Sequence, residues 1–125
     1  MVKEVTTLPS SRPRPFSSAV RAGDFIFTSG HAGIRDSDGN ELKTVEEQTR
    51  RTLESLKATL EAAGASLDDV VKVTCFLGDQ AHFSKMNEVY TSFFKGELPA
   101  RSTCITGLAV PGMLIEMECI AYNPK

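Results

Sequence analysis

Alternating apolar and polar residues mark the strands that this sequence predicts, because successive side chains of a β-strand point to opposite faces of the sheet. The ranges predicted as strands are 3–7, 19–21, 25–28, 70–77, 101–108 and 113–122. The strand over 70–77 has apolar residues on both faces: Val71, Val73, Cys75 and Leu77 on one, and Val70 and Phe76 on the other. We therefore expect this strand to be covered on both sides, by helices on one and by a partner subunit on the other.

Turn residues separate several of these strands. Ala22-Gly23-Asp24 lies between the second and third strands and predicts a hairpin. Ala109-Val110-Pro111-Gly112 lies between the last two strands and predicts that they pair as an antiparallel hairpin. Residues 8–16 are rich in proline, which removes backbone donors, so an extended loop is expected there.

A first helix is predicted between Thr44 and Gly64. Thr44 and Glu47 have the spacing of a capping box, and glycine is a common helix stop. Apolar residues recur at helical spacing along this segment: Leu53, Leu56, Leu60 and Ala63.

A second helix is predicted from about Asp79 to Gly96. Its apolar stripe consists of Phe83, Met86, Tyr90, Phe93 and Phe94. Asn87 falls inside this stripe, three residues before Tyr90. It is either a half-buried amide whose hydrogen bonds are satisfied locally or that caps a neighbouring loop, or a polar group directed into a pocket, and the periodicity leaves both open.

These elements follow the order β-β-β-α-β-α-β-β, which is an α+β pattern. A chain of 125 residues is long enough for one core but short for two. We predict a single domain over residues 1–125, with one mixed β-sheet and both helices packed on one face.

Charge and composition exclude several classes of function. The net charge is −2 with acidic and basic residues mixed, so the basic patch that attracts nucleic acid or anionic membranes is missing. No apolar run reaches membrane-spanning length, and the N-terminus lacks the apolar segment of a secretory signal. We expect a cytoplasmic protein.

The cysteines and histidines give no sign of a metal site. Cys75, Cys104 and Cys119 are widely spaced in apolar strands and predict buried, reduced thiols. His31 and His82 stand alone, without the spacing of metal ligands. No metal is therefore predicted.

Two charged residues interrupt segments that otherwise have core composition. Arg101 lies in Pro99-Ala100-Arg101-Ser102-Thr103, and Glu116 lies in Ile115-Glu116-Met117-Glu118. Burial of a guanidinium or a carboxylate is costly unless each finds a partner. Either Arg101 pairs with one of the two glutamates, or it is kept free for an anionic ligand.

The remaining chemistry is limited. The sequence has no serine-hydrolase elbow, no cysteine with a nearby histidine, and no phosphate-binding or dinucleotide-binding glycine pattern. A guanidinium can bind a small carboxylate in bidentate fashion, and a carboxyl can transfer one proton. Imines already hydrolyse in water, so positioning and proton transfer suffice for such a substrate.

Four segments resemble, in order and spacing, the Rid (YjgF-like) family of reactive-intermediate deaminases, some of which carry the name L-PSP endoribonuclease or translation inhibitor. The segments are Ser29-Gly30, Met86-Asn87, Pro99-Ala100-Arg101-Ser102 and Ile115-Glu116-Met117-Glu118. The resemblance spans about 3–122. It implies a chorismate-mutase-like α+β fold and a homotrimer with a central barrel-like core and clefts between subunits.

The resemblance also implies roles for individual residues. Arg101 would bind the substrate carboxylate, Glu116 would hold the attacking water or pass its proton, and the main chain of Thr103 would orient the water or the imine nitrogen. Glu118 would be structural. The residues implied to shape the substrate cleft are Ser29, Gly30 and Asn87, with Phe16 at its mouth.

Three positions depart from the best-known imine deaminases. Those proteins have tyrosine where this chain has Phe16, cysteine where it has Thr103, and glutamine where it has His31. Loss of the tyrosine hydroxyl removes a polar group and would alter the substrate range. His31 is either a titratable group at the cleft or a surface or capping side chain.

The implied activity is hydrolytic deamination of 2-iminopropanoate (or its enamine, 2-aminoacrylate) and 2-iminobutanoate to 2-keto acids and ammonia, without a metal or organic cofactor. Dehydratases that depend on pyridoxal phosphate release these acids from serine or threonine. Two alternatives remain. One is a non-catalytic trimer that binds small molecules. The other is an RNA-acting endoribonuclease or translation inhibitor, which the net charge of −2 disfavours.

Overall fold

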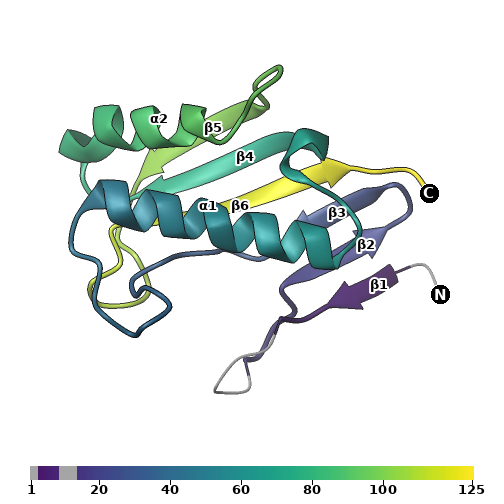
Figure 1. Ribbon diagram of the computed structural model, residues 1–125, viewed down its shortest axis with the longest axis horizontal. Coiled ribbons are helices and arrows are strands. Elements are labelled where there is room, and N and C mark those ends of the chain that lie inside the picture. Colours follow the sequence, from purple (N-terminus) through teal and green to yellow (C-terminus); the bar gives the residue numbers. More distant parts are fainter. Residues whose placement is uncertain (1–2, 9–13) are drawn as a thin grey trace.

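The computed structural model describes residues 3–8 and 14–125, which form one six-stranded sheet with two α-helices on one face (Figure 1). The predicted mixed α+β fold is thus confirmed. The proline-rich loop predicted over 8–16 lies partly outside the described residues. The strands are β1 (Lys3–Thr6), β2 (Ala19–Ala22), β3 (Phe25–Thr28), β4 (Val70–Leu77), β5 (Ala100–Ile105) and β6 (Ile115–Tyr122), and the helices are α1 (Val45–Ala62) and α2 (Phe83–Ser92).

The strands lie in the order β1-β2-β3-β6-β4-β5. The predicted hairpin of the second and third strands is confirmed, since β2 and β3 pair antiparallel with Ala22 opposite Phe25. Gly23 in their turn has a φ of +62°, in the left-handed region that glycine adopts without strain.

The prediction that the last two strands pair as a hairpin is wrong. β5 pairs in parallel with β4, whereas β6 pairs antiparallel with both β3 and β4, so β4 separates the two. α2 returns the chain between β4 and β5, and a helical crossover of this kind makes the flanking strands parallel. The Pro111-Gly112 turn lies inside a longer connection, 106–114, that leads past the end of β4 to β6.

The face of the sheet that the helices cover holds the core. β6 presents four residues to it, Ile115, Met117, Cys119 and Ala121, each at most 4% exposed. From α1, the predicted residues Leu53, Leu56 and Leu60 pack against them. The capping box of α1 is confirmed, because the Glu47 amide donates to the Thr44 hydroxyl and the Glu47 carboxylate accepts from the Thr44 amide.

The predicted faces of β4 need one correction. A β-bulge shifts the register between Val70 and Lys72, and Val71 is the extra residue. Val70 is therefore buried with the core, while Val71 is 45% exposed rather than buried beside Val73.

α2 follows a short 3₁₀ turn over Gln80–His82, which Asp79 caps by accepting from the Ala81 amide. Met86 and Tyr90 of the predicted stripe are buried. Phe83 is 41% exposed, since it begins the helix at the rim of the layer instead of inside it.

The cysteines divide by the face on which they lie. Cys75 and Cys119 point into the core, as predicted, and burial raises the pKa of each thiol to about 11. Cys104 is exposed, contrary to the prediction, because it lies on the edge strand β5 and points to the face without helices.

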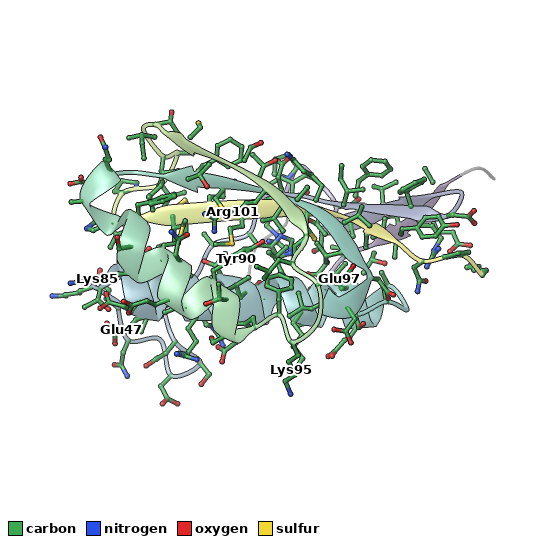
Figure 2. The ribbon with its side chains drawn as sticks, turned by 90° about the horizontal axis from the view of Figure 1, so that it is seen from above. Glu47, Lys85, Tyr90, Lys95, Glu97 and Arg101 are labelled. Atoms are coloured by element: carbon green, nitrogen blue, oxygen red, sulfur yellow. The ribbon has the colours of Figure 1, made fainter. Side chains whose placement is uncertain are left out.

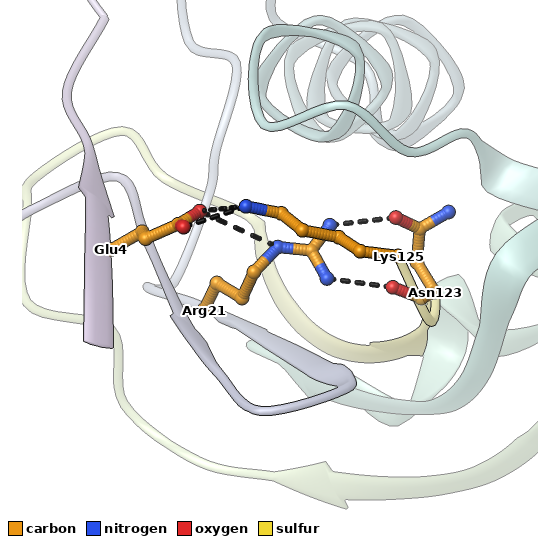
Figure 3. Close-up of polar contacts among 4 residues, drawn as sticks. All are labelled: Glu4, Arg21, Asn123 and Lys125. Atoms are coloured by element: carbon orange, nitrogen blue, oxygen red, sulfur yellow. Dashed lines mark hydrogen bonds and ion pairs between the residues drawn. The ribbon is translucent and has the colours of Figure 1, made fainter. Parts of the chain in front are cut away.

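A polar cluster joins the two ends of the described chain (Figure 3). Arg21 is only 6% exposed, and its guanidinium donates to the Asn123 carbonyl and side-chain oxygens, both at 2.6 Å. Glu4 accepts from Lys125 at 2.6 Å and lies 3.8 Å from Arg21. The cluster attaches β1 and β2 to the segment that follows β6.

Gln48 is a fully buried amide on α1 that the sequence pattern does not reveal. Its Nε2 donates to the carbonyls of Leu42 and Gly112 at 2.9 and 2.8 Å, and its Oε1 accepts from the Leu114 amide at 2.8 Å. One side chain thus satisfies backbone groups of the loop before α1 and of the loop before β6.

We expect Gln48→Leu to lower the free energy of unfolding by about 3 kcal/mol, because the substitution removes three hydrogen bonds to part-buried backbone groups, each worth about 1 kcal/mol. Urea unfolding at a fixed protomer concentration measures the change. The control is Gln80→Leu at an exposed position, which should change stability by less than about 0.5 kcal/mol. Equal stability of the two variants would contradict the role of Gln48.

Candidate functional site

Arg101 and Glu116 lie on opposite faces of the sheet. Arg101 is opposite Val73 in the β4–β5 register, and Val73 belongs to the buried face. Glu116 is opposite Phe76, whose side chain alternates to the other face. No ion pair joins Arg101 to Glu116 or Glu118 within residues 3–8 and 14–125, so an internal salt bridge is not the function of Arg101 in this chain.

The arginine half of the candidate site lies between β5 and α2. Arg101 lies beside Tyr90 (Figure 2), with its guanidinium carbon 4.7 Å from the ring centre of Tyr90. The same carbon is 5.6 Å from the ring centre of Phe83. Such stacking on aromatic rings stabilises the cation without neutralising it, and the donors at the guanidinium edge stay available. Burial raises the pKa of Tyr90 to about 12, so its hydroxyl stays protonated.

Two other side chains of this half have a polar atom without a hydrogen-bond partner in the described part of the chain. Asn87 is half-buried on α2, and its Oδ1 has no hydrogen-bond partner among the described residues. The same holds for the Tyr90 hydroxyl. Of the two interpretations of Asn87, a locally satisfied amide does not fit. Thr103 follows Arg101 on the same face of β5, opposite Cys75.

The glutamate half is built around the segment Ser29-Gly30-His31. The His31 amide donates to the Met117 carbonyl at 2.7 Å, and the Met117 amide donates back at 2.9 Å, which fixes this segment beside β6. A methyl group on Gly30 would overlap Oε2 of Glu116. Position 30 therefore has no room for a side chain, because the Glu116 carboxylate packs directly on the Gly30 main chain.

Ser29 connects this half to Phe16. The Ser29 hydroxyl donates to the Ser17 carbonyl at 2.5 Å, and its amide donates to the Ser18 carbonyl at 3.0 Å. The neighbouring Phe16 is 47% exposed, and the Arg14 guanidinium carbon lies 5.3 Å above its ring. The structure thus brings Phe16, Ser29, Gly30 and Glu116 to one region.

Of the interpretations of His31, a surface side chain does not fit the structure. His31 is 9% exposed and points toward α1, where its Nε2 lies 2.8 Å from the Thr59 hydroxyl. Its Nδ1 lies 2.8 Å from the Ser29 carbonyl. Burial lowers the pKa of His31, and the nearby charge of Arg14 lowers it further, against the opposing effect of the Ser29 carbonyl.

The face of the sheet opposite the helices carries large apolar side chains without cover. Phe25, Phe27 and Tyr122 form an aromatic cluster there, with ring centres 6.5 and 5.2 Å from Phe25, and each ring is more than 40% exposed. We call this surface the open face. Glu116 and Glu118 belong to it, whereas Arg101, Thr103 and Asn87 belong to the helix-covered side.

Neither a metal site nor a membrane-spanning helix is found among residues 3–8 and 14–125. These residues contain no cluster of three or more potential metal ligands. None of their helices is long and apolar enough to cross a membrane.

Known proteins share both the sequence and the fold. The sequence profile of the family described as Endoribonuclease L-PSP matches residues 9–123. A RutC family protein of Pyrococcus abyssi is 46% identical over 126 residues, covering 98% of this chain and 99% of that protein. The chloroplastic Reactive Intermediate Deaminase A of Arabidopsis thaliana is 38% identical over 108 residues, covering 86% of this chain and 58% of that protein.

Solved structures show the same architecture. The Rid-family protein YyfA of Yersinia pestis, described as of unknown function, superposes with a TM-score of 0.87 at 33% identity, covering 96% of this chain and 98% of that one. Escherichia coli TdcF, crystallised with bound serine, superposes with a TM-score of 0.82 at 31% identity, covering 95% of this chain and 93% of that one.

We expect Gly30→Ala to displace the Glu116 carboxylate, because the added methyl group would overlap Oε2. A crystal structure of the variant measures the displacement, which should exceed about 1 Å given normal van der Waals separations of about 3.5–4 Å. The control is Gly107→Ala, where an added methyl group meets no atom within 4 Å and Glu116 should not move. An unmoved carboxylate in Gly30→Ala would contradict the close packing.

Proposed function

This chain belongs to the endoribonuclease L-PSP family, and we propose that it hydrolyses reactive 2-imino acids. The proposed substrates are 2-iminopropanoate, 2-iminobutanoate and their enamine tautomers, and the products are 2-keto acids and ammonia. The observation that carries this proposal is the Arg101 guanidinium, stacked on Tyr90 and Phe83 without a carboxylate partner in the described part of the chain.

Two relatives support a small amino-acid-like substrate. One carries the name reactive intermediate deaminase, and another was crystallised with serine. A 2-imino acid has the same carboxylate as serine, attached to a carbon that carries nitrogen. A bidentate contact from Arg101 would fix that carboxylate and thereby the position of the neighbouring C=N bond.

The proposed reaction needs one water molecule and one proton carrier. The Glu116 carboxylate accepts a proton as the water oxygen attacks C2, and the C=N double bond becomes a single bond in a tetrahedral carbinolamine. Glu116 then delivers this proton to the nitrogen, and a second transfer through Glu116 moves the hydroxyl proton of the carbinolamine to the same nitrogen. The C–N bond breaks, and ammonia leaves as the keto group forms. The main chain at Thr103 orients the water or the nitrogen, while Asn87, Ser29, Gly30 and Phe16 border the substrate.

We further propose that the working unit is a homotrimer with its sites between subunits. Arg101 and Glu116 belong to opposite sides of one sheet, so a second copy of the chain is needed to bring an arginine to a glutamate. The open face offers the surface for this contact, because its exposed aromatic rings are the kind of side chain that subunit interfaces bury.

The two alternative functions fit the site less well. An RNA-acting protein would bring phosphates to the open face, where Glu116 and Glu118 repel them. A non-catalytic binding trimer would use the same arginine but leave Glu116 without a role. A competition assay separates this alternative from an enzyme. A dehydratase generates the imine in situ, and semicarbazide traps it. Only an enzyme converts imine to keto acid before the trap reacts.

Arg101→Ala should reduce imine hydrolysis in this assay by at least about a hundredfold, because the substrate carboxylate loses its ligand. Arg101→Lys should restore little of the activity, since an ammonium group cannot replace the bidentate guanidinium. Circular dichroism checks that both variants fold. Full activity of folded Arg101→Ala would exclude the proposed role of Arg101.

Glu116→Gln should lower the hydrolysis rate by about a hundredfold or more, in the range typical of general acid–base groups, because the amide keeps the shape but cannot carry the proton. Glu118→Gln is the matched control on the same strand and face, and should affect stability more than rate. An equal or larger loss of activity in Glu118→Gln would show that the wrong glutamate is assigned.

Mixed trimers of Arg101→Ala and Glu116→Gln subunits test the shared site directly. If each site takes Arg101 from one subunit and Glu116 from its neighbour, refolding a 1:1 mixture should restore about a quarter of the sites. If both residues came from one chain, the mixture would stay as inactive as its components. Light scattering on the same samples measures the oligomeric state.

A further inference from the structure

We propose that His31 is a positioning residue for Glu116: its neutral imidazole connects α1 to the segment whose Gly30 supports the Glu116 carboxylate. The catalytic consequence rests on the proposed imine hydrolysis. The connection itself is made by contacts that hold whatever the substrate is.

The hydrogen bonds of His31 determine which nitrogen carries the proton. The Ser29 carbonyl can only accept, so Nδ1 at 2.8 Å must be the N–H donor. Nε2 is then the unprotonated nitrogen and accepts the hydroxyl proton of Thr59, also at 2.8 Å. Both nitrogens of the neutral ring are therefore used, one on the cleft segment and one on α1.

The main chain of His31 extends this connection to Glu116. Its amide and carbonyl exchange two hydrogen bonds with Met117, the residue after Glu116. The residue before it, Gly30, is the one on which the carboxylate packs. Since Thr59 is fully buried in α1, the Glu116 carboxylate is supported through His31 by the best-packed helix of the fold.

The surroundings of the ring favour its neutral form. α1 faces it with the uncharged Thr59, β6 contributes the Met117 main chain, and Arg14 is the described charged group that acts on it. Burial is the main cause of the lowered His31 pKa, from an ordinary value of 6.5. A protonated ring would carry a buried charge next to a cation and could no longer accept from Thr59.

This arrangement makes the support acid-sensitive. The unfolded chain binds a proton at His31 more readily than the folded chain, so stability rises with pH. The His31 contribution is complete above the ordinary value of 6.5 and is lost as the pH falls below it toward the lowered folded pKa. We therefore expect the acid limb of the kcat profile to follow the titration of His31.

Three variants test this proposal. His31→Gln keeps an acceptor for Thr59 but cannot titrate, so the kcat of this variant should fall less steeply as the pH is lowered. Thr59→Val removes the hydrogen bond between α1 and His31. It should lower kcat by about tenfold and change KM by less than about twofold, because a misplaced catalytic group slows the reaction without weakening substrate binding. The matched control is Thr52→Val, which removes an equally buried hydroxyl that bonds only within α1, to the Gln48 carbonyl, and should leave kcat unchanged.

A measurement without substrate keeps the proposal testable if imine hydrolysis fails. Amide hydrogen exchange at Gly30, His31 and Met117 should accelerate at least about tenfold in Thr59→Val but not in Thr52→Val. The His31 ring resonance, identified as the one missing in His31→Gln, should titrate below 6.5. Unchanged exchange in Thr59→Val, titration at or above 6.5, or an unaltered acid limb in an active His31→Gln would overturn the proposal. Absence of imine hydrolysis in the natural protein would reject the proposed function alone.

Discussion

The alternation of side chains across one sheet is the constraint on which the rest of this molecule depends. β4 pairs with β5 on one edge and β6 on the other, so the registers of both pairs decide which residues share a face. These registers place Arg101 opposite the buried Val73, and they place Glu116 opposite Phe76 on the open face. The two charges are thereby separated by the thickness of the sheet, and neither neutralises the other.

This separation explains why Arg101 and Glu116 form no ion pair with each other in the described part of the chain. A guanidinium near the core normally needs a carboxylate, and Arg101 has two aromatic rings instead. The rings reduce the cost of partial burial while the guanidinium edge stays free. Under the proposed function, the same separation makes one chain an incomplete site. The uncovered aromatic rings of the open face would then be the surface on which a second copy of the chain completes it.

The features predictable from the sequence are those set by local physics. Capping at Thr44, the periodicity of Leu53, Leu56 and Leu60, and the hairpin turn at Gly23 involve only near neighbours in the chain. The pairing of the last two strands was not predictable from their turn, because a crossover helix and competition for the edge of β4 decide it. The bulge at Val71 likewise changes which side chains are buried without leaving a mark in the alternation.

The buried polar contacts of α1 were the hardest to predict, and they shape the site most. Gln48 and Thr59 look like ordinary polar residues of an amphipathic helix, yet Gln48 holds the loop that leads into β6, and Thr59 meets His31. Each contact joins residues far apart in the chain, and only the packed fold brings them within bonding distance. Glu116, the proposed catalytic carboxyl, lies on β6 between these two supports. Its position on the open face therefore depends on a helix on the other side of the sheet.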